Sequence, residues 1–235
     1  MTAPYDNDEV FGHYASPPCF MHELDPAYLG VPEMHDRDVK DWRRAERRRL
    51  IARRLALHPD ERQHASARIR HRLDETVGDP SGLVVSGYWP WRGEPDLRAW
   101  LALVHARGGR CALPVVTARN EPLTFRHWQP GDRMARGSHG IPEPVHGEAV
   151  VPDVVVAPVV GFDDSGYRLG YGGGFYDRTL AHLSARPRAI GVGFSAAHIP
   201  TIHPRPHDIS MDLIVTEREV HAATAPRADV PGLRF

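Results

Sequence analysis

Cysteine is scarce in this chain of 235 residues, and so are long hydrophobic runs. The two cysteines, Cys19 and Cys111, lie far apart, so the sequence contains neither a disulfide framework nor a Cys-x-x-Cys pair. No apolar stretch approaches the roughly 20 residues that a membrane-spanning helix needs. The first 14 residues, MTAPYDNDEVFGHY, are acidic and do not resemble a signal peptide. These absences predict a cytoplasmic protein with no membrane partner.

An excess of charge of one sign is also missing. The chain has 29 basic and 30 acidic side chains, a net charge of -1 and a pI near 7.0. Such a balance gives no overall field that would attract nucleic acid or an anionic membrane. The hydrophobic content of 41% and the charged content of 25% are ordinary for a globular protein. We therefore expect one sizeable domain, as a monomer or a homodimer, and no nucleic-acid partner.

The pattern of apolar residues divides the chain into three parts. Residues 1–38 predict an irregular extension, residues 39–220 an α/β domain and residues 221–235 a tail. The domain begins with a strongly basic helix over residues 39–57, which has a narrow apolar stripe. Pro59 fits the first turn of a second helix that extends to about residue 77.

Beyond residue 80 the pattern alternates between strand and helix. Strands are expected at residues 83–88, 111–116, 123–128, 154–160, 189–194 and 213–215, with a helix at 95–107 and a loop at 129–150. Continuous apolar strands separated by helices indicate a mostly parallel sheet that is covered on both faces. The sequence therefore predicts a three-layer α/β/α sandwich.

A glycine-rich run, RLGYGGGFYDR at residues 168–178, is the most informative motif. Its glycines leave a turn without side chains, where backbone N–H groups can approach a ligand closely. An apolar strand before the turn and a helix after it would form a phosphate cradle, because the helix N-terminus has free donors and a positive dipole. Arg168 and Arg178 add cations, and Asp177 adds an oxygen ligand suited to Mg²⁺. The run predicts a nucleotide site, although the spacings of the P-loop and of Gly-x-Gly-x-x-Gly are both absent.

Read with its upstream strand, this run closely resembles the signature of the 5-formyltetrahydrofolate cyclo-ligase (methenyltetrahydrofolate synthetase) family. Other pieces follow in the family's order, and the resemblance covers roughly residues 39–217. These pieces are Lys40 and Arg44 as a Lys-x-x-x-Arg element, residues 88–96 as a folate-pocket strand and loop, residues 140–144 as Gly-Ile-x-Glu-Pro, and His207-Asp208 followed by residues 212–216. Several ordered motifs are more specific than any one alone.

The resemblance implies an enzyme that depends on ATP and Mg²⁺. Such an enzyme converts 5-formyltetrahydrofolate into 5,10-methenyltetrahydrofolate and releases ADP and phosphate. In the family's proposed mechanism the formamide oxygen attacks the γ-phosphorus, N10 then attacks the activated carbon, and phosphate leaves as the ring closes. Phosphoryl transfer of this kind needs positioning and charge neutralisation more than a covalent side-chain catalyst.

The resemblance also implies roles for individual residues. Arg168 and Asp177 are the expected catalytic residues, and Asp177 and Asp208 the expected metal ligands. The expected ATP contacts are Lys40, Arg44, Arg168, Leu169, Gly170, Tyr171, Gly172, Gly173, Gly174, Phe175, Tyr176 and Asp208. The expected folate contacts are Trp89, Glu94, Tyr171, Gly172, Gly173, Gly174 and Phe175, since an aromatic wall with a carboxylate suits a pterin. Strand alternation predicts that only one of Trp89 and Trp91 faces the site.

Plainer interpretations stay open for several of these residues. Glu94 suits the start of a helix before Pro95, Asp208 suits a turn, and Glu143 is equally suited to hold a loop in place. A cyclo-ligase-like paralogue with another substrate, for example a thiamin-related one, is the alternative enzyme. A nucleic-acid-binding module on the basic residues 40–72 is less favoured, because that segment lacks interleaved aromatics beyond Trp42 and the overall charge is near neutral.

The histidines and acids near the N-terminus do not predict a metal site. Their spacings fit no standard zinc pattern. These residues are His13, Cys19, His22, Glu23, His35 and Asp36.

Overall fold

The computed structural model of the chain describes residues 35–224. The chain divides into two compact units, Met1–Asp38 and Val39–Phe235, and the second contains every strand of the sheets below. Most of the predicted extension and tail therefore lies outside the described residues, as do His13, Cys19, His22 and Glu23.

The centre of the domain is an eight-stranded sheet in the order β12-β11-β10-β7-β1-β2-β3-β6. Five neighbouring strands are parallel: β11 (Leu213–Val215), β10 (Arg188–Val192), β7 (Val154–Pro158), β1 (Val84–Ser86) and β2 (Arg110–Val115). Antiparallel strands complete both edges, with β12 (Val220–Ala222) on one side and β3 (Thr124–His127) and β6 (Ala149–Val150) on the other. The continuous apolar runs of β7 and β10 correspond to burial on both faces.

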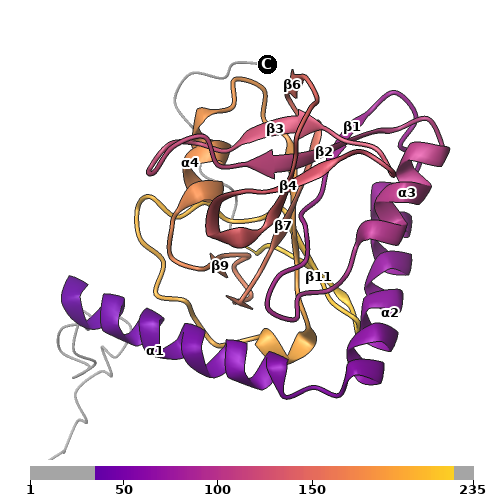
Figure 1. Ribbon diagram of the computed structural model, residues 1–235. Helices are drawn as coiled ribbons and strands as arrows, with labels where there is room; N and C mark the ends of the chain where they lie inside the picture. Colours follow the sequence, from indigo (N-terminus) through magenta and orange to yellow (C-terminus); the bar gives the residue numbers. More distant parts are fainter. Residues whose placement is uncertain (1–34, 225–235) are drawn as a thin grey trace, which may run out of the picture. The chain divides into compact units, whose positions relative to one another are not determined.

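Helices cover both faces of this sheet (Figure 1). On one face α2 (Pro59–Val77) and α3 (Arg98–Ala106) place Ile69, Leu73 and Trp100 in a large apolar cluster with strand residues. On the other face α4 (Phe175–His182) contributes Leu180 to a second cluster. The predicted α/β fold with a mostly parallel central sheet is confirmed. None of the described helices combines the length and the apolar character needed to cross a bilayer.

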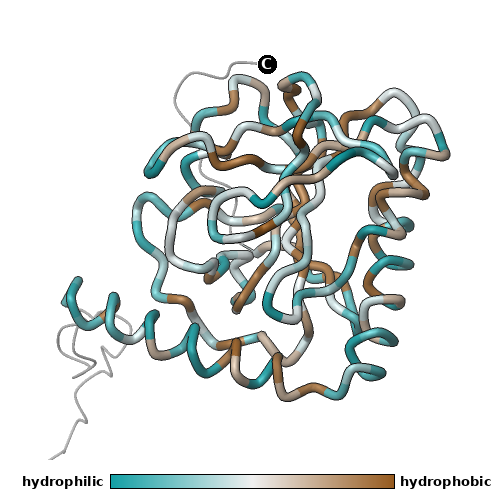
Figure 2. The backbone as a smooth tube through the Cα atoms, viewed as in Figure 1, coloured by the Kyte–Doolittle hydropathy of each residue, from teal (hydrophilic) through white to brown (hydrophobic). Residues whose placement is uncertain are grey.

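Helix α1 (Asp36–Leu55) buries an unusual face. Its buried residues are Val39, Arg43, Leu50 and Arg54, so two arginines share the face with two apolar side chains. Leu50 belongs to a third apolar cluster that also includes Leu169 and Ile202. Figure 2 shows how strongly hydrophilic residues predominate along this helix. The narrow apolar stripe that the sequence predicts is therefore present, and buried arginine side chains form the rest of the packed face.

Short strands account for the differences from the predicted elements. The expected loop at 129–150 contains β4 (Met134–Arg136) and β5 (Pro142–Pro144), which form a separate two-stranded sheet, and it ends in β6. After β7, the hairpin of β8 (Gly161–Phe162) and β9 (Arg168–Leu169) precedes the glycine-rich run, so the run follows β9 directly. Strands of two or three residues are too short to show a period of two in the sequence.

Truncating Ile190 should destabilise the domain strongly, because this side chain is completely buried in the central strand β10. We expect Ile190→Ala to lower the free energy of unfolding by roughly 2–5 kcal/mol. The matched control is Val220→Ala on the edge strand β12, where the side chain is 41% exposed, and there the change should stay within about 0.5 kcal/mol. Urea unfolding followed by circular dichroism measures both, and equal effects would contradict the assigned core.

Candidate active site

A cavity of about 480 Å³ opens at the carboxyl ends of the parallel strands. Its walls come from the segments that follow β1, β2, β7 and β9 and from the β4–β5 region. The chain passes from β1 to β2 on one side of β1, whereas β7 and β10 lie on its other side. The cavity therefore lies where the strand order reverses, which is the usual ligand site of an open parallel sheet.

The glycine-rich loop forms one rim of the cavity and leads directly into α4. Gly172 and Gly174 have positive φ angles of 98° and 64°, which favour glycine. Gly174 immediately precedes the helix, and no side chain of the described residues caps that end. The N–H groups of the first helical turn are therefore oriented toward the loop, as a phosphate cradle requires.

Arg168 and Asp177 bind each other at the base of this loop. Arg168 Nη1 donates to Asp177 Oδ1 at 3.1 Å and to the carbonyl of Ile209 at 2.9 Å. The backbone N–H of Ile209 donates to the same carboxylate oxygen at 3.1 Å. Arg168 is almost completely buried, while the Asp177 side chain is 20% exposed. Within residues 35–224, Asp177 Oδ2 has no hydrogen bond, so one oxygen remains for a ligand.

Asp208 is engaged with an arginine of α1. Arg43 Nη2 lies 2.5 Å from Asp208 Oδ2, and both side chains are 9% exposed. Burial raises the pKa of Asp208, but hydrogen bonds from Arg43 and from the backbone of Arg205 outweigh it and hold the pKa below its ordinary value. Asp208 is therefore an ionised partner of Arg43. Among the described residues, no group of three or more His, Cys, Asp or Glu side chains is arranged to hold a metal ion.

A second, strongly basic cavity of about 760 Å³ adjoins the first. Arg43, Arg47, Arg92, Tyr171, Gly172 and His207 line both cavities. The predicted Lys40 and Arg44 line only the second one, and both are exposed. The sequence did not single out Arg43 and Arg47, because α1 carries so many arginines that charge alone cannot distinguish its faces.

Arg47 of α1 contacts the backbone of the glycine-rich loop. Its Nε donates to the carbonyl of Gly170 at 2.8 Å, and a Cβ added to Gly172 would lie 3.5 Å from its Nη1. Burial, and then repulsion by Arg43, lower the pKa of Arg47 from its ordinary value. Asp208 pairs with Arg43, and within residues 35–224 Arg47 has no ion pair, which leaves local positive charge for an anion.

Aromatic side chains form the other half of the first cavity. Trp89 and Trp91 both line it, so the prediction that only one of them faces the site is wrong. Strand β1 ends at Ser86, and the alternation of strand side chains does not apply beyond it. Tyr88, which the sequence did not single out, is buried there as well and donates to the carbonyl of Pro95.

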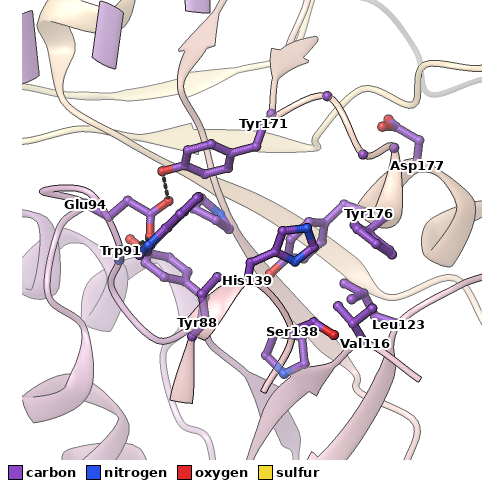
Figure 3. Close-up of a pocket in the computed structure, with 18 of the residues that line it drawn as sticks. Tyr88, Trp91, Glu94, Val116, Leu123, Ser138, His139, Tyr171, Tyr176 and Asp177 are labelled. Atoms are coloured by element: carbon purple, nitrogen blue, oxygen red, sulfur yellow. Dashed lines mark hydrogen bonds between the residues drawn. The ribbon is translucent and has the colours of Figure 1, made fainter. Parts of the chain in front are cut away.

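Glu94 is the buried carboxylate of this aromatic half, and Figure 3 shows it opposite Asp177. It is only 7% exposed. Tyr171 donates to its Oε1 at 2.7 Å, and the backbone N–H of Trp91 donates to its Oε2 at 2.8 Å. Burial raises the pKa of Glu94 to about 7, although the Tyr171 hydrogen bond, the Arg54 charge and the Trp91 hydrogen bond each lower it.

The remaining predicted residues lie around the same cavity, with one exception. Gly173, Phe175 and Tyr176 line it, and the hydroxyl of Tyr176 is buried with no hydrogen-bond partner in the described part of the chain. The side chain of Leu169 is instead completely buried in the third apolar cluster. On the opposite wall, Ser138, His139, Ile141, Pro142 and Glu143 come from the β4–β5 region.

Comparison with known proteins agrees with this geometry. The model of the 5-formyltetrahydrofolate cyclo-ligase family matches residues 39–217. This chain belongs to the 5-formyltetrahydrofolate cyclo-ligase family. The match includes both the glycine-rich loop and the helix α1 arginines.

Curated relatives and a solved structure extend the comparison. A 5-formyltetrahydrofolate cyclo-ligase of Mycolicibacterium smegmatis is 36% identical over 152 residues, which are 59% of this chain and 75% of that protein. The enzyme of the same name from Escherichia coli K12 is 30% identical over 179 residues, 72% of this chain and 96% of that protein. The solved 5,10-methenyltetrahydrofolate synthetase of Aquifex aeolicus is 30% identical with a TM-score of 0.67, and it covers 79% of this chain and 95% of its own.

Replacing Glu94 should change how stability depends on pH. Because the pKa of Glu94 in the folded protein lies above the ordinary 4.5, its ionisation costs more in the folded protein than in the unfolded chain. The stability that this carboxyl contributes is thus present at acidic pH and lost as the pH rises through about 7. The unaltered protein should therefore lose roughly 2–3 kcal/mol of unfolding free energy between pH 5 and pH 8 that Glu94→Gln does not lose.

Urea unfolding at both pH values measures this difference. The matched control is Glu121→Gln, which alters an exposed glutamate and should show no comparable gain. A Glu94→Gln protein whose relative stability is the same at pH 5 and pH 8 would contradict the assigned burial of this carboxyl.

Proposed function

We propose that this chain is a 5-formyltetrahydrofolate cyclo-ligase, which uses ATP and Mg²⁺ to form 5,10-methenyltetrahydrofolate with release of ADP and phosphate. Family membership over residues 39–217 supports the reaction. The observation that carries the proposal is the pairing of the two cavities. An aromatic cavity with a buried carboxylate adjoins a strongly basic one, and they meet at a glycine-rich loop.

The basic cavity suits the phosphates of ATP. Its cationic lining residues are Lys40, Arg43, Arg44, Arg47, Arg48, Arg92 and Arg205, with His207 beside them and Asp41 as the acidic residue. Planar guanidinium groups bind phosphate oxygens in pairs, and backbone N–H groups at the start of α4 add further donors. We assign Arg47 the position nearest the transferred group, because it contacts the glycine-rich loop.

Asp177 suits a magnesium ion that ATP brings with it. Magnesium usually takes one or two carboxylates together with substrate phosphates and water. One free carboxylate oxygen therefore fits such an ion. When bound, Mg²⁺ would neutralise charge on the phosphates. Arg168 fixes the orientation of Asp177 through its hydrogen bond. Asp208 acts on the nucleotide through Arg43, with which it is paired.

The aromatic half suits the pterin of the folate. Trp89 and Trp91 offer flat apolar surfaces, and Glu94 offers a carboxylate that accepts ring N–H groups. A formamide oxygen held between this half and the loop would lie next to the phosphate that it attacks. Positioning of the two substrates in this way is the main contribution that a phosphoryl-transfer site can make.

Turnover with and without the Asp177 carboxylate tests this function. Purified protein mixed with MgATP and 5-formyltetrahydrofolate should give the methenyl product, which is followed by its near-ultraviolet absorbance. Asp177→Asn should lower kcat/KM by about 100-fold or more, because the charge on a metal ligand is lost while the shape is kept. The control Asp79→Asn alters an exposed aspartate that likewise accepts one backbone N–H, and it should retain full activity.

Two results would contradict the proposal. ATP binding without any methenyl product would indicate a family member that acts on another substrate. Full activity of Asp177→Asn would refute the metal-binding role of this residue.

A further inference from the structure

Among the described residues, one buried arginine of α1 has no carboxylate partner. Arg54 is 7% exposed, and within residues 35–224 it forms no ion pair. Its Nε donates to the carbonyl of Arg92 at 2.9 Å, and its Nη1 lies 3.5 Å from the carbonyl of Val159. Its Nη2 donates to the hydroxyl of Tyr171 at 2.6 Å. A buried cation with this many directed hydrogen bonds is held in one place.

Tyr171 joins this cation to Glu94. Its hydroxyl accepts from Arg54 and donates to Glu94 Oε1 at 2.7 Å, the dashed bond in Figure 3. The phenol ring lies against Trp91, with ring centroids 4.8 Å apart. The backbone N–H of Trp91 holds the second oxygen of Glu94. A chain of two short hydrogen bonds thus runs from Arg54 through Tyr171 to the carboxylate, and we call it the relay.

The relay opposes the rise that burial causes in the pKa of Glu94. Burial favours the neutral carboxyl, whereas the Tyr171 hydrogen bond and the Arg54 charge favour the carboxylate. Other groups facing Glu94 are neutral phenols, Tyr88 and Tyr176, whose pKa values are raised mainly by their own burial. The charged or titratable residues that line the cavity around it are Arg43, Arg47, Arg92, His139, Glu143, Arg168, Asp177, His207 and Asp208.

We propose that Arg54 and Tyr171 are positioning residues that keep Glu94 ionised and oriented toward the folate. This inference rests on the proposed function, because it requires that the Glu94 carboxylate accept N–H groups of the pterin. Arg54 touches no substrate in this account and acts through Tyr171. Tyr171 belongs to the glycine-rich loop, so the relay also ties that loop to the folate half of the cavity.

Removing one oxygen atom tests the relay. Tyr171→Phe keeps the ring against Trp91 and deletes both hydrogen bonds. Binding of 5-formyltetrahydrofolate is measured by tryptophan fluorescence between pH 5.5 and pH 9, in the presence of Mg²⁺ and a non-hydrolysable ATP analogue. In the unaltered protein, affinity should fall as the pH drops through about 7. In Tyr171→Phe this midpoint should move up by about one pH unit or more, since a hydrogen bond to a charged group is lost.

The shape of the pH profile separates the relay from a simple structural role. With the relay, Tyr171→Phe loses about fivefold in affinity near pH 7 and about tenfold near pH 6, but approaches the unaltered protein at pH 9, where Glu94 is ionised in both. An equal loss at every pH, or an unchanged midpoint, would overturn the proposal. Arg54→Gln should move the midpoint in the same direction, and Glu94→Gln should abolish the pH dependence.

Two controls keep the outcomes distinct. Tyr167→Phe makes the same chemical change four residues earlier, outside the cavity lining, and should leave the profile unchanged. The unaltered protein must also form the methenyl product. If it does not, the proposed function fails; if it does while Tyr171→Phe keeps the original midpoint, the relay alone is refuted.

Discussion

The site depends on three arginines that helix α1 directs into the protein. Arg43, Arg47 and Arg54 follow one another at spacings of four and seven residues, which places them on one face of a helix. Their guanidinium groups bind segments outside the helix. Arg43 holds Asp208 and the carbonyls of Ile202 and His203. Arg47 holds the glycine-rich loop, and Arg54 holds the turn before Glu94 together with Tyr171.

This arrangement explains why so basic a helix is part of the domain. A buried charge is costly unless hydrogen bonds satisfy it, and each of these arginines has directed acceptors. Those acceptors belong to segments that have little regular structure of their own. The arginines therefore stabilise the loops that form the cavity, and they leave a positive potential where the two cavities meet. One helix face thus serves the fold and, in the proposed function, the binding of phosphate.

The larger features of the fold could be predicted from sequence because they depend on apolar patterns. The apolar runs that became β7 and β10, and the start of a second helix at Pro59, could be recognised in the sequence alone. The hairpin of β8 and β9 was not, since strands of two residues have no period. The glycine-rich run could be recognised as a site because its glycines, arginines and aspartate form an uncommon combination.

Pairings between distant side chains could not be predicted in the same way. The family resemblance pointed to Lys40 and Arg44, yet Arg43 and Arg47 have the same four-residue spacing and line the cavity that also holds the aromatic side chains. Asp208 looked like a free ligand until its ion pair with Arg43 was visible. Arg54 belongs to no recognised motif, and its contact with Tyr171 joins residues that are 117 positions apart in the sequence. Such contacts arise only when the sheet brings the segments together.

The structure of the complex with Mg²⁺, a non-hydrolysable ATP analogue and 5-formyltetrahydrofolate tests the central claim most directly. The account predicts that the phosphates lie between Arg47 and the glycine-rich loop, with the metal on Asp177 and the pterin between the tryptophans and Glu94. Phosphates bound away from the inward face of α1, or a pterin that makes no contact with Glu94, would contradict it.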